Sequence, residues 1–249
     1  MKNPYIHRKM ICAPESFFGR QRELDRIYSL VESAQQVSVV GDRRIGKSSL
    51  LCCLTLPEIQ AQHGQYDLSQ HVFVYIDLLR CAKYTPEEFL RYLLLELRKA
   101  TRGYFKMTIP VRNFNVEHFS EAIDRVMDLN KKLVFLLDEF DYVSRNEHFD
   151  LDFFNFLRSI AHNRALSFVT ASTKSLLDLC DKSVISSPFF NIFNVLKLGV
   201  LTRDEALELI CVPSERAGCS LVNDGKFILE LAGTHPFLLQ LACFFVFNT

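Results

Sequence analysis

The sequence predicts an α/β fold in which helices flank a five-stranded parallel sheet and a small helical lid follows. Over the first 200 residues, short and nearly continuously apolar segments alternate with amphipathic stretches, which is typical of buried parallel strands joined by crossover helices. After residue 200 only helical patterns occur. We therefore expect a core of residues 1–200 and a lid of residues 201–249. The expected strands are Gln36–Val40, His71–Leu78, Lys132–Asp138, Leu166–Ser172 and Asn194–Leu198.

Two of the expected helices begin with a capping box, in which a threonine and the glutamate three residues later bond each other's backbone. Thr85 and Glu88 form one box, with Pro86 at the first helical position, and Thr202 and Glu205 form the other. The other helices are predicted from the period of their apolar residues. The expected helices are 48–56, 85–102, 116–129, 151–162, 202–212, 224–231 and 235–247.

The composition is that of a globular protein with a sizeable core. The chain has 249 residues, of which 49% are hydrophobic, and 29 basic residues balance 29 acidic ones. This neutral balance gives no indication of a nucleic acid or of an anionic membrane as partner, although a local patch could still bind one. No apolar run approaches the roughly 20 residues that span a bilayer, and no secretory signal opens the chain. We expect a cytoplasmic location.

The eight cysteines are scattered, mostly within apolar segments, and no pair has the C-x-x-C spacing of a zinc or redox site. We interpret them as small buried residues in a reducing compartment. Neither they nor the seven histidines form a metal-ligand pattern. The cysteines are Cys12, Cys52, Cys53, Cys81, Cys180, Cys211, Cys219 and Cys243.

A phosphate-loop motif follows the first expected strand. Gly41–Ser48 fits the pattern of Gly, four residues, Gly-Lys-Ser between a strand and a helix, and so predicts a bound nucleoside triphosphate. Gly41 and Gly46 would let backbone N–H groups surround the β-phosphate at a helix start. Lys47 would neutralise the β and γ phosphates, and the hydroxyl of Ser48 would bind Mg²⁺.

Other residues of this loop are assigned to the same nucleotide site with less specificity. Ile45 and Ser49 flank the lysine and serine of the motif, and Arg44 precedes them. Arg43 and Arg44 could contact phosphate or a partner, but solvated loop arginines explain them equally well.

The third expected strand ends in acidic residues at the sheet edge where ligands bind in doubly wound folds. We assign Asp138 to the Mg²⁺ shell, through water, and Glu139 to the polarisation of the attacking water. Asp141 either supports this site or caps the following turn. An acidic loop without a function is the alternative for the group as a whole.

The adjacent acids Asp138 and Glu139 argue against small-molecule and nucleotide kinases, because these enzymes need no separate glutamate to activate water. The acids also imply that a further strand lies between the first and the third expected strands. Leu166–Ser172 is the candidate for this additional strand. Ser172 or Thr173 at its tip would contact the γ-phosphate or the water. The alternative is that both residues only form a turn, as serine and threonine often do after strands.

These residues together resemble the STAND class of P-loop ATPases, which are relatives of AAA+ proteins. The opening Asn3-Pro4-Tyr5-Ile6 is also similar to bacterial members. The resemblance covers nearly the whole chain in the right order. The segments that carry it are 17–24, 41–51, 133–141, 198–205 and 233–240.

The resemblance implies further site residues and a mode of action. Phe18, Gly19 and Arg20 would pack near the adenine, and His235 would lie near the phosphates, with Pro236 setting the start of its helix. Locally, His235 and Pro236 are equally well explained as an ordinary helix start. In this class ADP often holds a closed resting state, and exchange to ATP opens the molecule for self-assembly.

Three functions are compatible with the predicted fold and site. The first is a slow ATPase that acts as a switch between an ADP-bound closed state and an ATP-bound assembly state, with self-association or a protein partner at the Phe-rich C-terminal end. The second is an AAA-type motor or loader acting on DNA, against which the neutral charge argues. The third is a binding module in which the nucleotide is structural.

Overall fold

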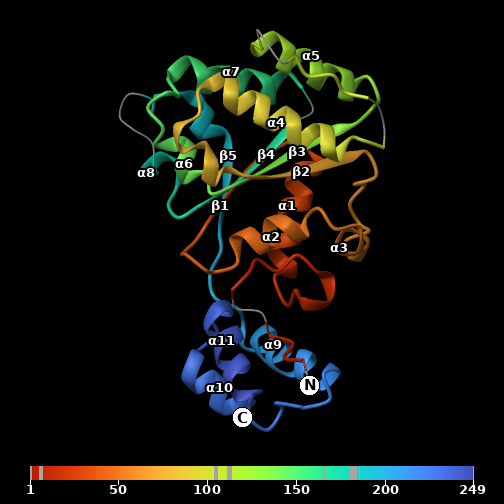
Figure 1. Ribbon diagram of the computed structural model, residues 1–249, viewed down its shortest axis with the longest axis vertical. Coiled ribbons are helices and arrows are strands. Elements are labelled where there is room, and N and C mark those ends of the chain that lie inside the picture. Colours follow the sequence, from red (N-terminus) through yellow and green to blue (C-terminus); the bar gives the residue numbers. More distant parts are fainter. Residues whose placement is uncertain are drawn as a thin grey trace.

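The computed structural model describes residues 2–5, 8–103, 106–110, 114–164, 166–179, 184 and 186–248. A sheet with helices on both faces forms one end of the molecule, and a group of three helices forms the other end (Figure 1). Within the described residues, no helix is both long enough and apolar enough to cross a membrane.

The sheet has five parallel strands in the order β2-β3-β4-β1-β5, which confirms the predicted fold class. The strand β4 lies between β1 and β3, as the acidic residues after the third strand imply. Three strands have the expected bounds, while β2 ends one residue earlier and β5 is shifted back by one residue. The strands are β1 (Gln36–Val40), β2 (His71–Asp77), β3 (Lys132–Asp138), β4 (Leu166–Ser172) and β5 (Phe193–Lys197).

The two faces of the sheet are covered by different helices (Figure 1). Along β3, Phe135 faces the cluster formed by α4 (Pro86–Ala100), α5 (Val116–Met127) and α7 (Leu151–Asn163). Its neighbour Val134 faces the opposite cluster, because successive side chains of a strand point to opposite faces. That second cluster is built on α1 (Gln21–Glu32), α2 (Lys47–Cys53) and α3 (Pro57–Gln62).

Short helices that the sequence did not predict connect these elements. They are the 3₁₀ turns η1 (Pro14–Ser16), η2 (Leu78–Lys83) and η3 (Pro188–Ile192), and the single-turn helices α6 (Asp141–Ser144) and α8 (Leu176–Leu179).

The lid consists of α9 (Arg203–Arg216), α10 (Gly225–Ala232) and α11 (Pro236–Val246). Both predicted capping boxes are present, at α4 and at α9. The helix α9 continues past Pro213, where the prediction ended it. Proline has no N–H, so Pro213 cannot donate to the carbonyl of Leu209. Within the same turn, the Ser214 hydroxyl donates to the Ile210 carbonyl oxygen at 3.0 Å.

The beginning of the chain packs on the lid. Tyr5 is buried in the lid's apolar cluster, donates its hydroxyl proton to the carbonyl of Ile210 and lies edge-on to Phe247 at 6.0 Å between ring centroids. Accordingly, the N-terminus lies beside α9 in Figure 1. The first residues thus contact the lid although the sequence grouped them with the core.

One expectation about the cysteines is wrong. Cys12 and Cys52, 40 residues apart in the chain, form a disulfide, whereas the sequence suggested only unpaired thiols. The pairing escaped the sequence because it depends on where an irregular N-terminal segment crosses α2. Among the other described cysteines, Cys53, Cys81 and Cys243 are buried free thiols as expected. Cys180 lies outside the described residues.

Candidate functional site

The phosphate loop connects β1 to α2, and its two motif glycines serve different purposes. Gly46 has a left-handed backbone, with φ of 103°, directly before the helix begins at Lys47. Gly41 has no such backbone, but a Cβ atom there would lie 2.6 Å from the carbonyl oxygen of Leu198. A side chain at Gly41 would therefore push the loop away from the residue that follows β5.

The Lys47 ammonium folds back over its own loop. Its Nζ donates to the carbonyl oxygens of Gly41 at 2.7 Å and Asp42 at 2.9 Å. Burial lowers the pKa of Lys47, and the nearby carboxylates of Glu139 and Asp138 oppose this shift. The cation therefore lies between the loop and the acids after β3, where a phosphate chain needs a positive charge.

The two predicted catalytic acids lie together at the carboxyl end of β3. Asp138 is 3% exposed, and both of its carboxylate oxygens accept hydrogen bonds, from the Tyr75 hydroxyl at 2.7 Å and the Glu139 amide at 3.0 Å. Glu139 has a left-handed backbone, with φ of 56°. Burial raises the pKa of Glu139, and the negative charge of Asp138 raises it further. Tyr75 escaped prediction because nothing near it in the sequence signals this contact.

The tip of β4 is joined to the loop after β3. The carboxylate of Asp141 accepts the Thr173 amide proton at 3.0 Å and also bonds the Thr173 hydroxyl. The Ser172 hydroxyl, fully buried, donates to the Lys174 carbonyl at 2.7 Å. Both predicted γ-phosphate contacts thus lie at the expected edge, with their hydroxyl groups bonded to protein. Asp141 connects the ends of β3 and β4, which favours the prediction that it supports this site.

Arg20 joins the phosphate loop to the lid. Its guanidinium donates to the carbonyls of Ile45 at 3.2 Å and Gly199 at 2.6 Å, and its amide donates to the Glu205 carboxylate at 2.8 Å. Gly19 is required beside it, since a Cβ atom would lie 2.8 Å from the Glu205 side chain and φ is +72°. The structure thus places these two residues in a clamp at the start of α9.

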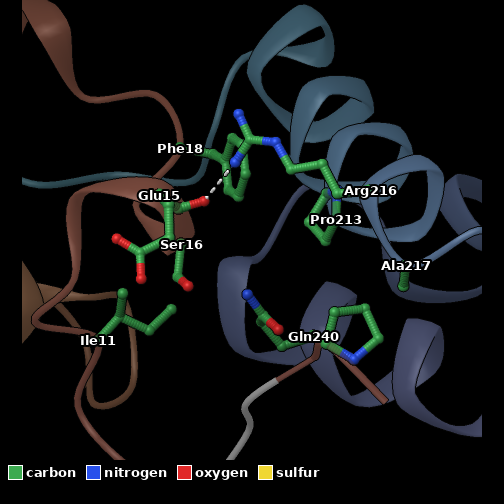
Figure 2. A pocket seen from close by; sticks show the side chains of 9 residues that line it. Ile11, Glu15, Ser16, Phe18, Pro213, Arg216, Ala217 and Gln240 are labelled. Carbon is green, nitrogen blue, oxygen red and sulfur yellow. Dashed lines mark hydrogen bonds between the residues drawn. The ribbon is translucent and has the colours of Figure 1, made fainter. Parts of the chain in front are cut away.

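A cavity of about 230 Å³ lies between the N-terminal segment (residues 2–20) and the lid, as Figure 2 shows. Arg216 closes one side by donating to the Glu15 carbonyl at 2.9 Å. Of the three residues predicted near adenine, only Phe18 lines the cavity. Its volume is below the roughly 300–1,000 Å³ of pockets for drug-sized ligands. Its lining is Pro4, Ile11, Glu15, Ser16, Phe18, Pro213, Arg216, Ala217 and Gln240.

The start of α11 lies against the phosphate loop. The guanidinium carbon of Arg44 is 4.4 Å from the centroid of the Phe237 ring. His235 occupies the N-cap position of the same helix, and its buried Nδ1 atom has no hydrogen-bond partner among the described residues. A buried nitrogen without a partner is costly unless a ligand satisfies it. The glycine loop, the Lys47 cation and this nitrogen therefore fit a nucleotide with its phosphates.

A sequence model of the family described as Novel STAND NTPase 2 matches residues 29–249. The chain belongs to this STAND NTPase family. No curated protein matches it.

The STAND NTPase shares its fold with several solved structures, at identities that support similarity of fold alone. The Walker-type ATPase of Pyrococcus abyssi aligns with a TM-score of 0.68 and 16% identity, over 94% of this chain and 68% of that one. The ORC2 protein of Aeropyrum pernix, solved as ADPNP-ADP complexes, gives 0.67 and 15%, over 89% and 59%. Domain III of the Thermotoga maritima replication initiation protein DnaA gives 0.55 and 16%, over 92% and 86%. This chain thus spans less than two thirds of the ORC2 protein.

The remaining predicted residues of the STAND NTPase surround the loop. Ser48 follows Lys47 on α2 and is partly exposed, and its hydroxyl and the Asp138 carboxylate are the hard oxygen donors that Mg²⁺ prefers. The Ser49 hydroxyl accepts the Ile11 amide proton at 3.0 Å, so it ties the cavity wall to α2. Pro236 opens α11 as expected.

Proposed function

We propose that this STAND NTPase is a switch that binds ATP or ADP between its sheet and its lid and hydrolyses ATP slowly. The observation that carries the proposal is the convergence of the loop, the acids and two lid helices. Arg44 contacts Phe237 at the start of α11, and Arg20 bonds Glu205 at the start of α9. A nucleotide on this loop would therefore contact parts of the molecule that can move relative to each other.

The adenine would occupy the cavity beside Phe18. Ile11 and Pro213 supply apolar walls on opposite sides of it, from the N-terminal segment and from α9. A base in this position would place the phosphates toward Lys47 and the orphan nitrogen of His235. This arrangement would join the lid, the N-terminal segment and the core through one ligand.

Hydrolysis would depend on the acids after β3. Bound Mg²⁺ would neutralise phosphate charge, with Ser48 and Asp138 as its protein contacts. Glu139 would orient the attacking water and accept its proton. The raised pKa of Glu139 supports this role, because a stronger base accepts a proton more readily in the transition state.

The two proposed states would arise because ADP and ATP favour different conformations of the protein. ADP at about a thousand times its dissociation constant would stabilise a closed state by roughly 4 kcal/mol relative to a form that does not bind it. Exchange to ATP would favour an assembly-competent state in the cytoplasm. Exposed Phe227 on α10 and Phe245 on α11 support association through the lid, either of copies of this chain or with a protein partner.

The first test identifies the nucleotide released from heated protein and compares the particle size in ADP and in ATP. We expect bound ADP, slow turnover and a larger particle with ATP. Lys47→Ala should lose nucleotide binding. Stimulation of turnover by DNA, with steep salt dependence, would instead favour the motor or loader.

The second test addresses Glu139. Glu139→Gln should retain ATP binding and lower the turnover rate by about 10²-fold or more, while Glu147→Gln, an exposed glutamate beyond α6, should leave it unchanged. Because the carboxylate is the active form, the wild-type rate should rise with pH through a pKa above the ordinary value of about 4.3. A Glu139→Gln rate equal to that of the wild type refutes the assignment.

A further inference from the structure

The disulfide connects two walls of the nucleotide site. Cys12 follows Ile11, which lines the cavity, and Cys52 lies in the last turn of α2, the helix that begins at Lys47. The Cα atoms of the two cysteines are 5.5 Å apart. A single covalent bond therefore fixes the cavity wall to the helix of the phosphate loop.

Among the described residues, two further polar contacts join Ile11 to α2. The Ile11 amide donates to the Ser49 hydroxyl at 3.0 Å, and the Cys53 thiol is 3.9 Å from the Ile11 carbonyl oxygen. Residues 8–13 belong to no helix or strand. Hydrogen bonds of this kind contribute only about 1 kcal/mol each, so without the disulfide Ile11 would be held weakly.

The two sulfur atoms differ in access. Cys12 is exposed, whereas Cys52 is only 7% exposed. A soluble thiol can therefore attack the Cys12 sulfur. The neighbouring Cys53 does not compete, because burial raises the pKa of its thiol to about 12 and keeps it protonated. The geometry thus provides one accessible sulfur and one protected leaving group.

We propose that the Cys12–Cys52 disulfide is a reversible redox site that sets the affinity of the nucleotide pocket. In reduction, a thiolate of a small dithiol attacks the Cys12 sulfur, the S–S bond breaks and Cys52 leaves as a thiolate that takes up a proton. The second thiol of the reductant then displaces Cys12. Two electrons and two protons pass to the protein, and the dithiol becomes a disulfide. A disulfide oxidant reverses both steps.

The oxidised form binds nucleotide more tightly, because the wall at Ile11 is ordered before the ligand arrives. After reduction, binding must also order the wall at Ile11, which lowers the affinity. We expect about a tenfold weaker affinity for ADP, within the usual range for coupled sites. This inference rests on the proposed nucleotide binding. It adds a regulatory input that the phosphate loop does not imply.

The test uses the wild-type chain, treated either with oxidised glutathione or with dithiothreitol. Alkylation followed by mass spectrometry identifies the linked peptides, and calorimetry with ADP measures the affinity of each form. We expect a Cys12–Cys52 link only in the oxidised protein, and a dissociation constant about tenfold higher after reduction. Cys12→Ser should have the reduced affinity under both conditions, and Cys219→Ser, which removes an exposed thiol elsewhere, should behave as the wild type.

The outcomes separate this inference from the proposed function. Equal ADP affinities in the two redox states, or oxidised protein without the Cys12–Cys52 link, overturn the inference and leave the switch intact. Absence of ADP binding in both states refutes the switch and this inference together. The wild-type comparison needs no variant, so it remains decisive even where Cys12→Ser folds poorly.

Discussion

At the scale of single residues, the carboxyl end of β3 concentrates negative charge beside the half-buried Lys47 ammonium. Two donors, the Tyr75 hydroxyl and the Glu139 amide, hold the Asp138 carboxylate in place. For Glu139, burial raises the pKa of the carboxyl, and the negative charge of Asp138 raises it further. Two adjacent carboxylates thus have different environments, which is how one can hold a cation while the other accepts a proton.

The contact between Tyr75 and Asp138 is a positioning contact whose loss should change the Mg²⁺ requirement. Tyr75→Phe removes the 2.7 Å bond to Asp138 and leaves its carboxylate free to turn. A hydrogen bond to a charged group contributes about 1.5–3 kcal/mol, so the Mg²⁺ concentration for half-maximal turnover should rise about tenfold or more. Magnesium titrations of ATP turnover measure this, with the rate at saturating Mg²⁺ nearly unchanged.

Tyr66→Phe is the control for this variant, because Tyr66 packs in the same apolar cluster, against Tyr28, away from the acids. It should leave the Mg²⁺ titration as in the wild type. A Tyr75→Phe protein with an unchanged titration would mean that Tyr75 only fills space beneath the site.

At the scale of elements, two lid helices approach the core by their first turns. The capping box of α9 has a second purpose, since Glu205 accepts both the Thr202 amide at 2.8 Å and the Arg20 amide at 2.8 Å. The sequence predicted the box but not the second bond. The first turn of α11 brings Phe237 to Arg44 of the loop. The first turns of α9 and α11 therefore connect the lid to Arg20 and to the phosphate loop.

Phe237 is expected to slow nucleotide release. Phe237→Leu keeps an apolar side chain on α11 but removes the cation–π contact with Arg44, which contributes about 0.5–1 kcal/mol because Arg44 is exposed. This energy corresponds to a roughly two- to fivefold rise in the dissociation rate of a fluorescent ADP analogue. Stopped-flow displacement measures it. The matched control is Phe227→Leu on α10, where the phenylalanine is 58% exposed.

A double-mutant cycle with Arg44→Ala isolates the contact. If the effects of Phe237→Leu and Arg44→Ala simply add, the two side chains do not act together and the lid is connected by other contacts.

At the scale of the whole molecule, the N-terminal segment connects the lid to the core. Tyr5 is buried in the lid, the disulfide attaches residue 12 to α2, and Arg20 reaches the phosphate loop. The cavity lies under this segment. Nucleotide affinity should therefore depend on residues that touch neither the phosphates nor the base.

Tyr5→Ala tests this dependence. Removing a buried aromatic side chain typically costs about 3–5 kcal/mol, so the lid should lose stability and ADP should bind more weakly. Thermal unfolding and ADP calorimetry measure the two effects. Tyr5→Phe, which removes the hydroxyl that donates to Ile210 but keeps the ring, should lose about 1 kcal/mol and keep most of the affinity. Unchanged ADP affinity in Tyr5→Ala would show that the N-terminal segment stabilises the lid without affecting nucleotide binding.

The sequence predicted those features of the fold that depend on residues close together in the chain. The strands β1, β3 and β4 have their predicted bounds, because each is a short apolar run between turn residues. The capping boxes at α4 and α9 are present for the same reason, since their partners are three residues apart. The position of β4 beside β3 followed from the acids after Asp138, because the additional strand is what places them beside the loop.

Only the tertiary structure decided which distant residues meet. The pairs Cys12–Cys52, Tyr75–Asp138 and Arg44–Phe237 join positions that no periodicity relates, and each depends on how a connecting segment packs. The sequence by itself determined a phosphate loop, two acids and a sheet to hold them, because short-range backbone preferences and apolar periodicity encode these. It did not determine the cavity beside Phe18, because that space exists only where the N-terminal segment, α9 and α11 pack against one another.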